Sequence, residues 1–251
     1  MTSELGEFDA DIDAMDLDVL DKFKLQLYRT YTKAFETHAI ERFVKEFDEE
    51  SHDVDSFNKI VELVIKEDPR FIPVITCAFA DELLTSTFKN ILPDGIPGGK
   101  GNMFGAYGPL SSLSKLIQIA YAFDVLSGDL LEELDRLRSA RNLISHSWDI
   151  ASLDDFFTKG RLADMHRMEE LLPEREGLEE EFSQEFQPLE AFRIRVVWIS
   201  GRLQYEAAAY NRSKVTRVRP SRVLYGKPTP KLLTQISSRC LQATREIVKR
   251  A

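Results

Sequence analysis

Cysteine is scarce in this chain, and several features that would define a class of protein are missing. Among 251 residues there are only two cysteines, Cys77 and Cys240, far apart in the sequence. This scarcity argues against a disulfide framework or a cysteine-based metal site, and it is typical of the reducing cytoplasm. No apolar run approaches the roughly 18–20 residues that a membrane-spanning helix needs. We therefore expect a cytoplasmic protein without a membrane segment.

Positive charge is absent from the beginning of the chain. Residues 1–21 include eight acidic residues and no Lys or Arg, whereas secretory and organellar leaders need early positive charge. We therefore expect no such leader. Residues 1–16, in which Asp alternates with small residues, are predicted to form an acidic N-terminal segment that is flexible or loosely docked.

Signatures of common catalytic and metal-binding sites are also missing. The four histidines have no spacing suited to zinc, and there is no Gly-x-Ser-x-Gly elbow. The glycine-rich segment 93–109 does not fit a P-loop, because Asp94 occupies the first required glycine and Gly101 replaces the magnesium-binding Ser or Thr. We expect no cofactor and no metal. The segment is instead predicted to be a connecting loop, with three residues packed against the body: Met103, Phe104 and Tyr107.

The net charge of −9 conceals a strong asymmetry. From residue 193 to the end there are 14 Lys and Arg against two Glu, a balance of +12, and the remaining residues have a balance of −21. Residues 211–251 are accordingly predicted to be a basic extension of an acidic body. Two interpretations are open: the halves attract each other or a second subunit, or the basic segment binds phosphate. We favour the first, because no base-reading motif accompanies the basic residues.

Apolar residues recur at three- and four-residue steps along most of the chain, the period of helices that bury one face. One long amphipathic helix, or two, is predicted between residues 17 and 47 by Leu20, Phe23, Leu27, Tyr31, Phe35 and Ile40. Further helices are predicted over 55–66, 71–92, 113–126, 127–149, 153–172, 192–210 and 232–248. A Glu-rich linker or solvated face is predicted over 169–190. Because no segment has the alternation of a strand, the predicted fold class is all-α, an antiparallel bundle over 17–210.

The stretch 127–149 combines core-forming and functional side chains. Its apolar face consists of Leu130, Leu134, Leu137 and Ile144. Its start has four residues that suit a helix N-terminus by capping or by negative charge: Ser127, Asp129, Glu132 and Glu133. Arg141 lies where this apolar face would continue, and Arg138, Asn142 and His146 follow the neighbouring face at four-residue spacing. Polar groups thus gather at the end of a core-forming helix, a conflict typical of functional sites.

The helix predicted over 71–92 is almost continuously apolar except at Asp81 and Glu82. This pattern predicts a well-buried helix with an embedded acidic pair. Arg141 could pair with either carboxylate and satisfy both anomalies at once, in which case these residues are purely structural.

Three of the polar residues suit one reaction, the attack of a ribose 2′-hydroxyl on the adjacent phosphodiester. The imidazole of His146 can relay protons near pH 7, and the guanidinium of Arg141 can hold the charge that develops on phosphorus. Asn142 could fix the phosphate or orient the imidazole. This chemistry needs no metal, so the enzymatic hypothesis is a metal-independent endoribonuclease.

At these residues the chain resembles a known fold. Arg141-Asn-Leu-Ile-Ser-His146 is similar to the Arg-x4-His signature, with Asn after the Arg, of the HEPN (higher eukaryotes and prokaryotes nucleotide-binding) helical fold. A wider block, loosely spanning 60–200, is similar to the mannitol operon repressor (MltR-like) family. Its matching segments are Ala80-Asp-Glu-Leu-Leu84, Met103-Phe-Gly105, Gly108-Pro-Leu-Ser-Ser112, Lys115, Ala120, Asp129-Leu130, Arg141-Asn142 and His146-Ser-Trp148.

The resemblance implies a homodimer of antiparallel helical bundles, with the Arg and His facing a cleft at or near the interface. In HEPN ribonucleases the matching residues are those of the nuclease, which here fall on Arg141 and His146. In MltR-like proteins the implied role is transcriptional repression through protein partners. The chain itself has no DNA-reading helix-turn-helix. We therefore expect an MltR-like regulator, with an RNA-cleaving HEPN enzyme, as in toxins and defence systems, and a structural adaptor as alternatives.

Overall fold

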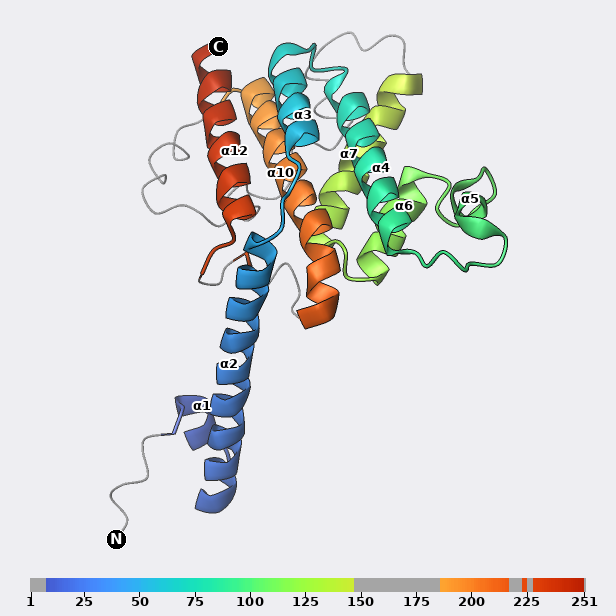
Figure 1. Cartoon of the computed structure of the whole chain (residues 1–251). Helices are drawn as coiled ribbons and strands as arrows, with labels where there is room; N and C mark the ends of the chain where they lie inside the picture. Colours follow the sequence, from blue (N-terminus) through green and yellow to red (C-terminus); the bar gives the residue numbers. More distant parts are fainter. Residues whose placement is uncertain (1–7, 147–185, 217–222, 225–227, 251) are drawn as a thin grey trace.

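The computed structural model describes residues 8–146, 186–216, 223–224 and 228–250. The described residues form helices and no strand, which confirms the predicted all-α class. In chain order the helices are α1 (Ala10–Asp13), α2 (Val19–Asp48), α3 (Asp55–Lys66), α4 (Ile72–Ile91), α5 (Gly99–Phe104), α6 (Leu113–Ala122), α7 (Gly128–His146), α10 (Pro188–Thr216) and α12 (Lys231–Arg250). The helix predicted over 153–172 and most of the Glu-rich segment 169–190 lie outside the described residues. Figure 1 shows a body of packed helices from which α2 projects.

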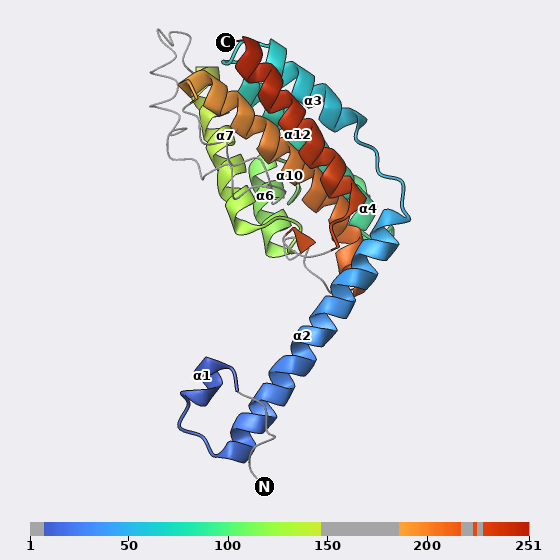
Figure 2. The same ribbon diagram turned by 90° about the vertical axis from the view of Figure 1, so that its left-hand side faces the viewer.

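Helix α10 is the centre of the body. It contacts α2, α3, α4, α7 and α12, and Figure 2 shows it between α12 and the pair α6 and α7. Its buried apolar residues include Ile194, Val196, Val197, Trp198, Ile199 and Leu203. Because consecutive residues point in different directions around a helix, the burial of these neighbouring residues means that α10 is covered on several sides. The predicted inward orientation of Val196, Val197, Ile199 and Leu203 is therefore confirmed.

Helix α12 packs along α10 at a glycine. A Cβ atom on Gly201 would lie 2.8 Å from Cγ2 of Ile236 and 2.9 Å from the sulfur of Cys240, so the close approach depends on the absence of a side chain. Leu233, Ile236 and Cys240 belong to the same core as α10. This part of the predicted basic extension 211–251 is thus built into the body.

Helices α4, α6 and α7 form the other side of the body. Helix α4 contacts α6 and α7, and α6 and α7 lie side by side, joined by a short turn. In that turn Asp124 has a φ of 57°, a left-handed conformation that Asp tolerates better than most residues. Leu130, Leu134 and Leu137 are buried, as their helical spacing predicts, and Ile144 is partly buried.

The loop between α4 and α6 contains the short helix α5. Met103 and Phe104 pack against the core, as predicted, and the ammonium of Lys89 lies 5.5 Å from the centre of the Phe104 ring. Tyr107 is fully exposed, so the prediction that it packs against the body is wrong. Tyr107 lies between Gly105 and Gly108, which have no side chains against which its ring could pack.

Helix α2 is a single helix, and only its C-terminal end lies in the body. Phe43, Val44 and Phe47 are buried there, whereas the preceding turns project away from the other helices (Figures 1 and 2). Helix α1 folds back along this projection. Its Ile12 is buried, and Arg29 of α2 pairs with carboxylates of the α1 segment. We call residues 9–38 the arm.

Candidate functional site

Arg141 lies on α7 and is half-buried. Its guanidinium donates two hydrogen bonds to the side-chain oxygen of the neighbouring Asn142, from Nη2 at 3.0 Å and from Nε at 3.3 Å. Among the described residues, Arg141 forms no ion pair with Asp81 or with Glu82. The structural pairing considered from the sequence is therefore not seen, and the amide of Asn142 orients the guanidinium instead.

His146 is the last residue of α7 and is exposed. It follows Arg141 by five positions, which is about 1.4 turns of a helix with 3.6 residues per turn. The two side chains therefore leave α7 in different directions, and no hydrogen bond joins them within the described residues. The structure joins Arg141 to Asn142 by hydrogen bonds and, among the described residues, forms none from either of them to His146.

The remaining predicted residues lie along the seam between α4 and α7. The charges of Asp81, Arg138 and Arg141 all act on the buried thiol of Cys77. Burial raises the pKa of Cys77 to about 11, and Arg141 and Arg138 only partly oppose this rise. A thiol with this pKa remains protonated at neutral pH, so it is a poor nucleophile there.

The two acidic residues of α4 differ in exposure. Asp81 is half-buried, whereas Glu82 is exposed, so the predicted embedded acidic pair is wrong for Glu82. Arg138 pairs with Asp135 one turn earlier on α7, at 2.8 Å. The seam is thus a partly charged contact between two helices, in which Asp81 and Arg138 accompany Arg141.

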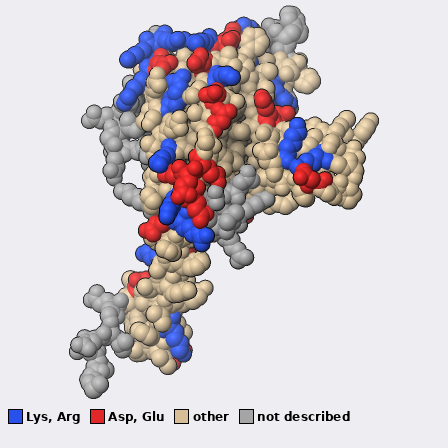
Figure 3. Space-filling model, in the orientation of Figure 1, with Lys and Arg blue, Asp and Glu red and all other residues tan. Residues whose placement is uncertain are grey.

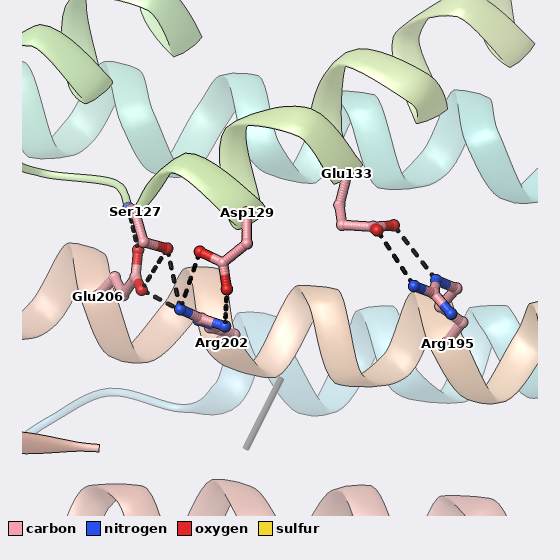
Figure 4. A network of polar contacts seen from close by, with 6 residues as sticks. All are labelled: Ser127, Asp129, Glu133, Arg195, Arg202 and Glu206. Atoms are coloured by element: carbon pink, nitrogen blue, oxygen red, sulfur yellow. Dashed lines mark hydrogen bonds and ion pairs between the residues drawn. The ribbon is translucent and has the colours of Figure 1, made fainter. Parts of the chain in front are cut away.

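A buried polar network joins the start of α7 to α10, as Figure 4 shows. The guanidinium of Arg202 donates to the carboxylate of Asp129 at 2.5 and 3.1 Å and to Glu206 at 3.0 Å. The backbone N–H and hydroxyl of Ser127 both donate to Glu206 at 2.9 Å. The side chains of Arg202 and Glu206 are nearly inaccessible, at 3% and 1% exposed. These contacts fix the first turn of α7 on the central helix.

The two carboxylates of this network differ in acidity. Burial raises the pKa of Glu206, although Arg202 and Ser127 stabilise its charged form. The pKa of Asp129 is lowered: burial would raise it, but the combined hydrogen bonds and charge of Ser127 and Arg202 outweigh burial. Asp129 is therefore the more firmly ionised partner of the guanidinium.

A second buried pair crosses the same two helices. Glu133 of α7 is fully buried and accepts hydrogen bonds from Arg195 of α10 at 3.1 and 3.2 Å. Arg136 of α7 adds a third contact to Glu133 at 3.2 Å. Sequence reasoning assigned Glu133 only to the favourable field at the helix start and missed its partner. Both networks join basic residues of α10 to acidic residues of α7, in keeping with the first interpretation of the charge asymmetry.

The arm has one face of large apolar side chains that are open to solvent. At 3.6 residues per turn these residues share one side of α2, and their exposed fractions range from 42% to 70%. We call them the stripe: Leu20, Phe23, Leu27, Tyr28, Tyr31 and Phe35. Helix α1 lies on the other side of α2, where Arg29 holds Asp9 and Asp11 at 2.9 and 2.7 Å. Figure 3 shows the arm as a mostly uncharged surface.

The sequence located this helix but not the exposure of its apolar face. A helical period identifies which residues share a face, and it does not identify what covers them. Five of the stripe residues, all except Tyr28, were therefore predicted to belong to an ordinary amphipathic helix of the bundle. The only hint in the sequence is that Tyr and Phe dominate the face, as they do at many protein interfaces.

Metal and membrane sites find no support in the part of the chain that the structure describes. No group of three or more His, Cys, Asp and Glu side chains there is placed to hold a metal ion. No helix in that part combines the length and the apolar character that crossing a membrane requires. Comparison of the chain with protein-family models, with curated proteins and with solved structures finds no match. The two candidate sites are the α4–α7 seam and the stripe, and each is defined by its own residues.

Proposed function

We propose that this chain is a cytoplasmic regulatory protein of the MltR-like kind, which acts by binding other protein chains and not by catalysis. The observation that carries the proposal is the exposed stripe on the arm. Monomeric proteins rarely expose contiguous apolar patches of more than a few hundred Å², and larger patches mark interaction sites. Four of the six stripe residues are aromatic, and aromatic side chains bury about 150–250 Å² each when covered.

The α4–α7 seam supports the same proposal through its chemistry. The guanidinium of Arg141 donates hydrogen bonds to Asn142, and no hydrogen bond joins His146 to either residue in the part of the chain that the structure describes. The raised pKa of Cys77 keeps its thiol neutral. A seam in this state suits the packing of two helices better than it suits proton transfer, for which an acid and a base must reach one substrate atom.

The proposal is tested by capture of bound proteins. The tagged full chain would be crosslinked in cells of its source organism, and chains other than its own would be identified by mass spectrometry. We expect a specific protein with the wild type and with Tyr107→Glu, and its loss with Tyr31→Glu. Tyr107 is a matched control because it is an exposed tyrosine outside the arm. Recovery of no other chain with the wild type would contradict the proposal.

A metal-independent endoribonuclease of HEPN type is the second candidate. The observation that favours it is the exposed imidazole of His146, on the same helix end as Arg141 and Asn142. Total RNA would be incubated with the full chain in EDTA, with His146→Ala and with His38→Ala as a control at another exposed histidine. We expect no cleavage by any of them. Cleavage by the wild type and His38→Ala that is lost in His146→Ala would replace the regulatory proposal.

A further inference from the structure

We infer that the stripe is the interface of a homodimer, in which two arms lie antiparallel with Leu27 of each copy facing Leu27 of the other. The inference rests on the proposed function: it makes a second copy the chain that the stripe binds, so the capture of another protein that Tyr31→Glu abolishes would depend on the dimer. It is argued from the area, length, register and charge of the arm.

The area of the stripe matches what a stable dimer needs. A standard interface buries about 800 Å² on each partner. The four aromatic residues of the stripe are 42–70% exposed, so covering them would bury on the order of 400–600 Å², at about 150–250 Å² for a fully exposed ring, and Leu20 and Leu27 add to this. The arm has no other described element on this side, since α1 occupies the other side of α2. A second stripe provides a surface of equal size and the same chemistry.

The length of the arm allows complete overlap of two stripes. The stripe residues are exposed along the helix, and Ala39 and Ile40 are the first apolar residues of α2 that pack against the core. With a two-fold axis at Leu27, Val19 of one copy reaches Phe35 of the other, and the pairing ends before either body begins. Figure 2 shows the arm clear of the body along this length. Both stripes are therefore covered along their length without a collision between the bodies.

The antiparallel register is self-complementary. An axis at Leu27 places Phe23 opposite Tyr31 of the second copy, so that aromatic rings meet at two symmetric points. In a parallel register the two bodies would lie at the same end of the paired arms, whereas the antiparallel register keeps them at opposite ends.

The charge of the arm argues against other occupants. Residues 9–38 contain seven acidic and four basic residues, and three of the basic residues are paired within the arm: Lys22 with Asp13, Lys24 with Asp21, and Arg29 with Asp9 and Asp11. Nucleic acids and anionic lipid surfaces are bound by unpaired Lys and Arg. A net acidic arm with an apolar face suits another polypeptide.

The first test is the mass of the full chain in solution, measured by sedimentation equilibrium. We expect the wild type and Tyr107→Glu to have twice the mass of one chain. Tyr31→Glu places a charge in the apolar contact twice per dimer, and we expect it to raise the dissociation constant at least tenfold. Because Tyr31 is exposed in the single chain, circular dichroism should show unchanged helix content. A monomeric wild type overturns the inference.

The second test fixes the register by disulfide crosslinking. The native Cys77 and Cys240 are buried and do not compete. Disulfides require Cα atoms about 4.4–6.8 Å apart. Antiparallel arms bring two copies of Leu27→Cys together, whereas copies of Leu20→Cys are separated by about 21 Å along the helix at 1.5 Å per residue. We expect crosslinking of Leu27→Cys alone, and equal crosslinking of both variants would overturn the antiparallel register.

The two proposals fail in different ways. A monomeric chain that captures another protein through Tyr31 refutes the homodimer and leaves the regulatory function standing. A crosslinked dimer that recovers no other chain supports the homodimer and refutes the regulatory function.

Discussion

Arg202, in the middle of α10, binds Asp129, in the first turn of α7, through two hydrogen bonds of 2.5 and 3.1 Å. The same guanidinium binds Glu206 one turn later on α10. One buried cation thus holds two carboxylates from two helices. Because removal of one member leaves uncompensated buried charge, the cluster determines how firmly α7 is attached to the centre of the body.

Replacement of Arg202 is expected to destabilise the fold strongly. Arg202→Met retains much of the side-chain volume but leaves Asp129 and Glu206 without their cation, and we expect a loss of about 3–5 kcal/mol in the free energy of unfolding. Urea denaturation followed by circular dichroism measures this loss. Arg70→Met is the matched control, because Arg70 pairs with Asp68 at the exposed surface, where ion pairs contribute little. Similar losses in both variants would contradict the assignment of a buried network.

The acidity of Asp129 predicts a pH dependence with a definite sign. Its lowered pKa means that its charge stabilises the fold above the ordinary pKa of about 3.9, and that this contribution is lost as the pH falls through the folded value. Asp129→Asn should therefore be less stable than the wild type at pH 7, with a difference that narrows below about pH 4. Urea midpoints measured from pH 3 to pH 7 test this.

Glu206 should give the opposite sign. Its raised pKa means that its contribution is present below the unfolded pKa and is lost as the pH rises through the folded value. The stability difference between the wild type and Glu206→Gln should therefore narrow as the pH is raised above about 4.3. The same urea titration provides the measurement, and parallel pH profiles for Glu206→Gln and Asp129→Asn would show that the two acidities are assigned incorrectly.

The thiol of Cys77 should be unreactive in the folded chain. It is buried, and its pKa of about 11 leaves a negligible thiolate fraction at pH 7.5. Iodoacetamide should label Cys77 only after denaturation, as judged by peptide mass spectrometry. An exposed Ser112→Cys or Ser139→Cys introduced elsewhere provides a reactive control. Rapid labelling of native Cys77 would mean that the α4–α7 seam opens readily.

Arg141 should matter much less to stability than Arg202. Its described contact is a hydrogen bond to the adjacent Asn142, and a hydrogen bond contributes about 0.5–1.5 kcal/mol net. We expect Arg141→Ala to lower the free energy of unfolding by about 1 kcal/mol in urea. A loss of about 3–5 kcal/mol would instead indicate a buried ion pair, and the structural adaptor would then be the better description of the seam.

The sequence predicted local elements well and long-range charge pairing poorly. The periodicity of apolar residues located α3 over its full length and α4 and α12 closely, because each apolar face must be buried. It predicted only residues 192–210 of α10, which runs from Pro188 to Thr216. The burial of Glu133 was not predicted, since its partner Arg195 lies 62 positions away and nothing in a single sequence links two such charges. Among the candidate residues, the adjacency of Arg141 and Asn142 and the different direction of His146 both followed from the sequence, whereas the hydrogen bonds from the guanidinium of Arg141 to Asn142 did not.

The exposed arm shows a second limit of sequence reasoning. Tyr31 and Phe43 occupy the same continuous helical pattern, yet Tyr31 is exposed and Phe43 is buried. The apolar spacing is the same at both residues, because it shows only that an apolar neighbour covers that face of the helix. Which element that neighbour belongs to depends on the rest of the fold. For Phe43 it is the body, and for Tyr31 we propose a second chain.

The unbroken course of α2 has a mechanical consequence. Phe47, whose ring lies 6.2 Å from that of Tyr205 in the core, is about 40 Å along the helix from Leu20, at 1.5 Å per residue. A tilt of about 5° at Phe47 would therefore displace Leu20 by roughly 3–4 Å over that length. A small change in the packing of these two rings would therefore move the far end of the arm by several times as much. A force applied to that end would, in turn, act on the same aromatic contact.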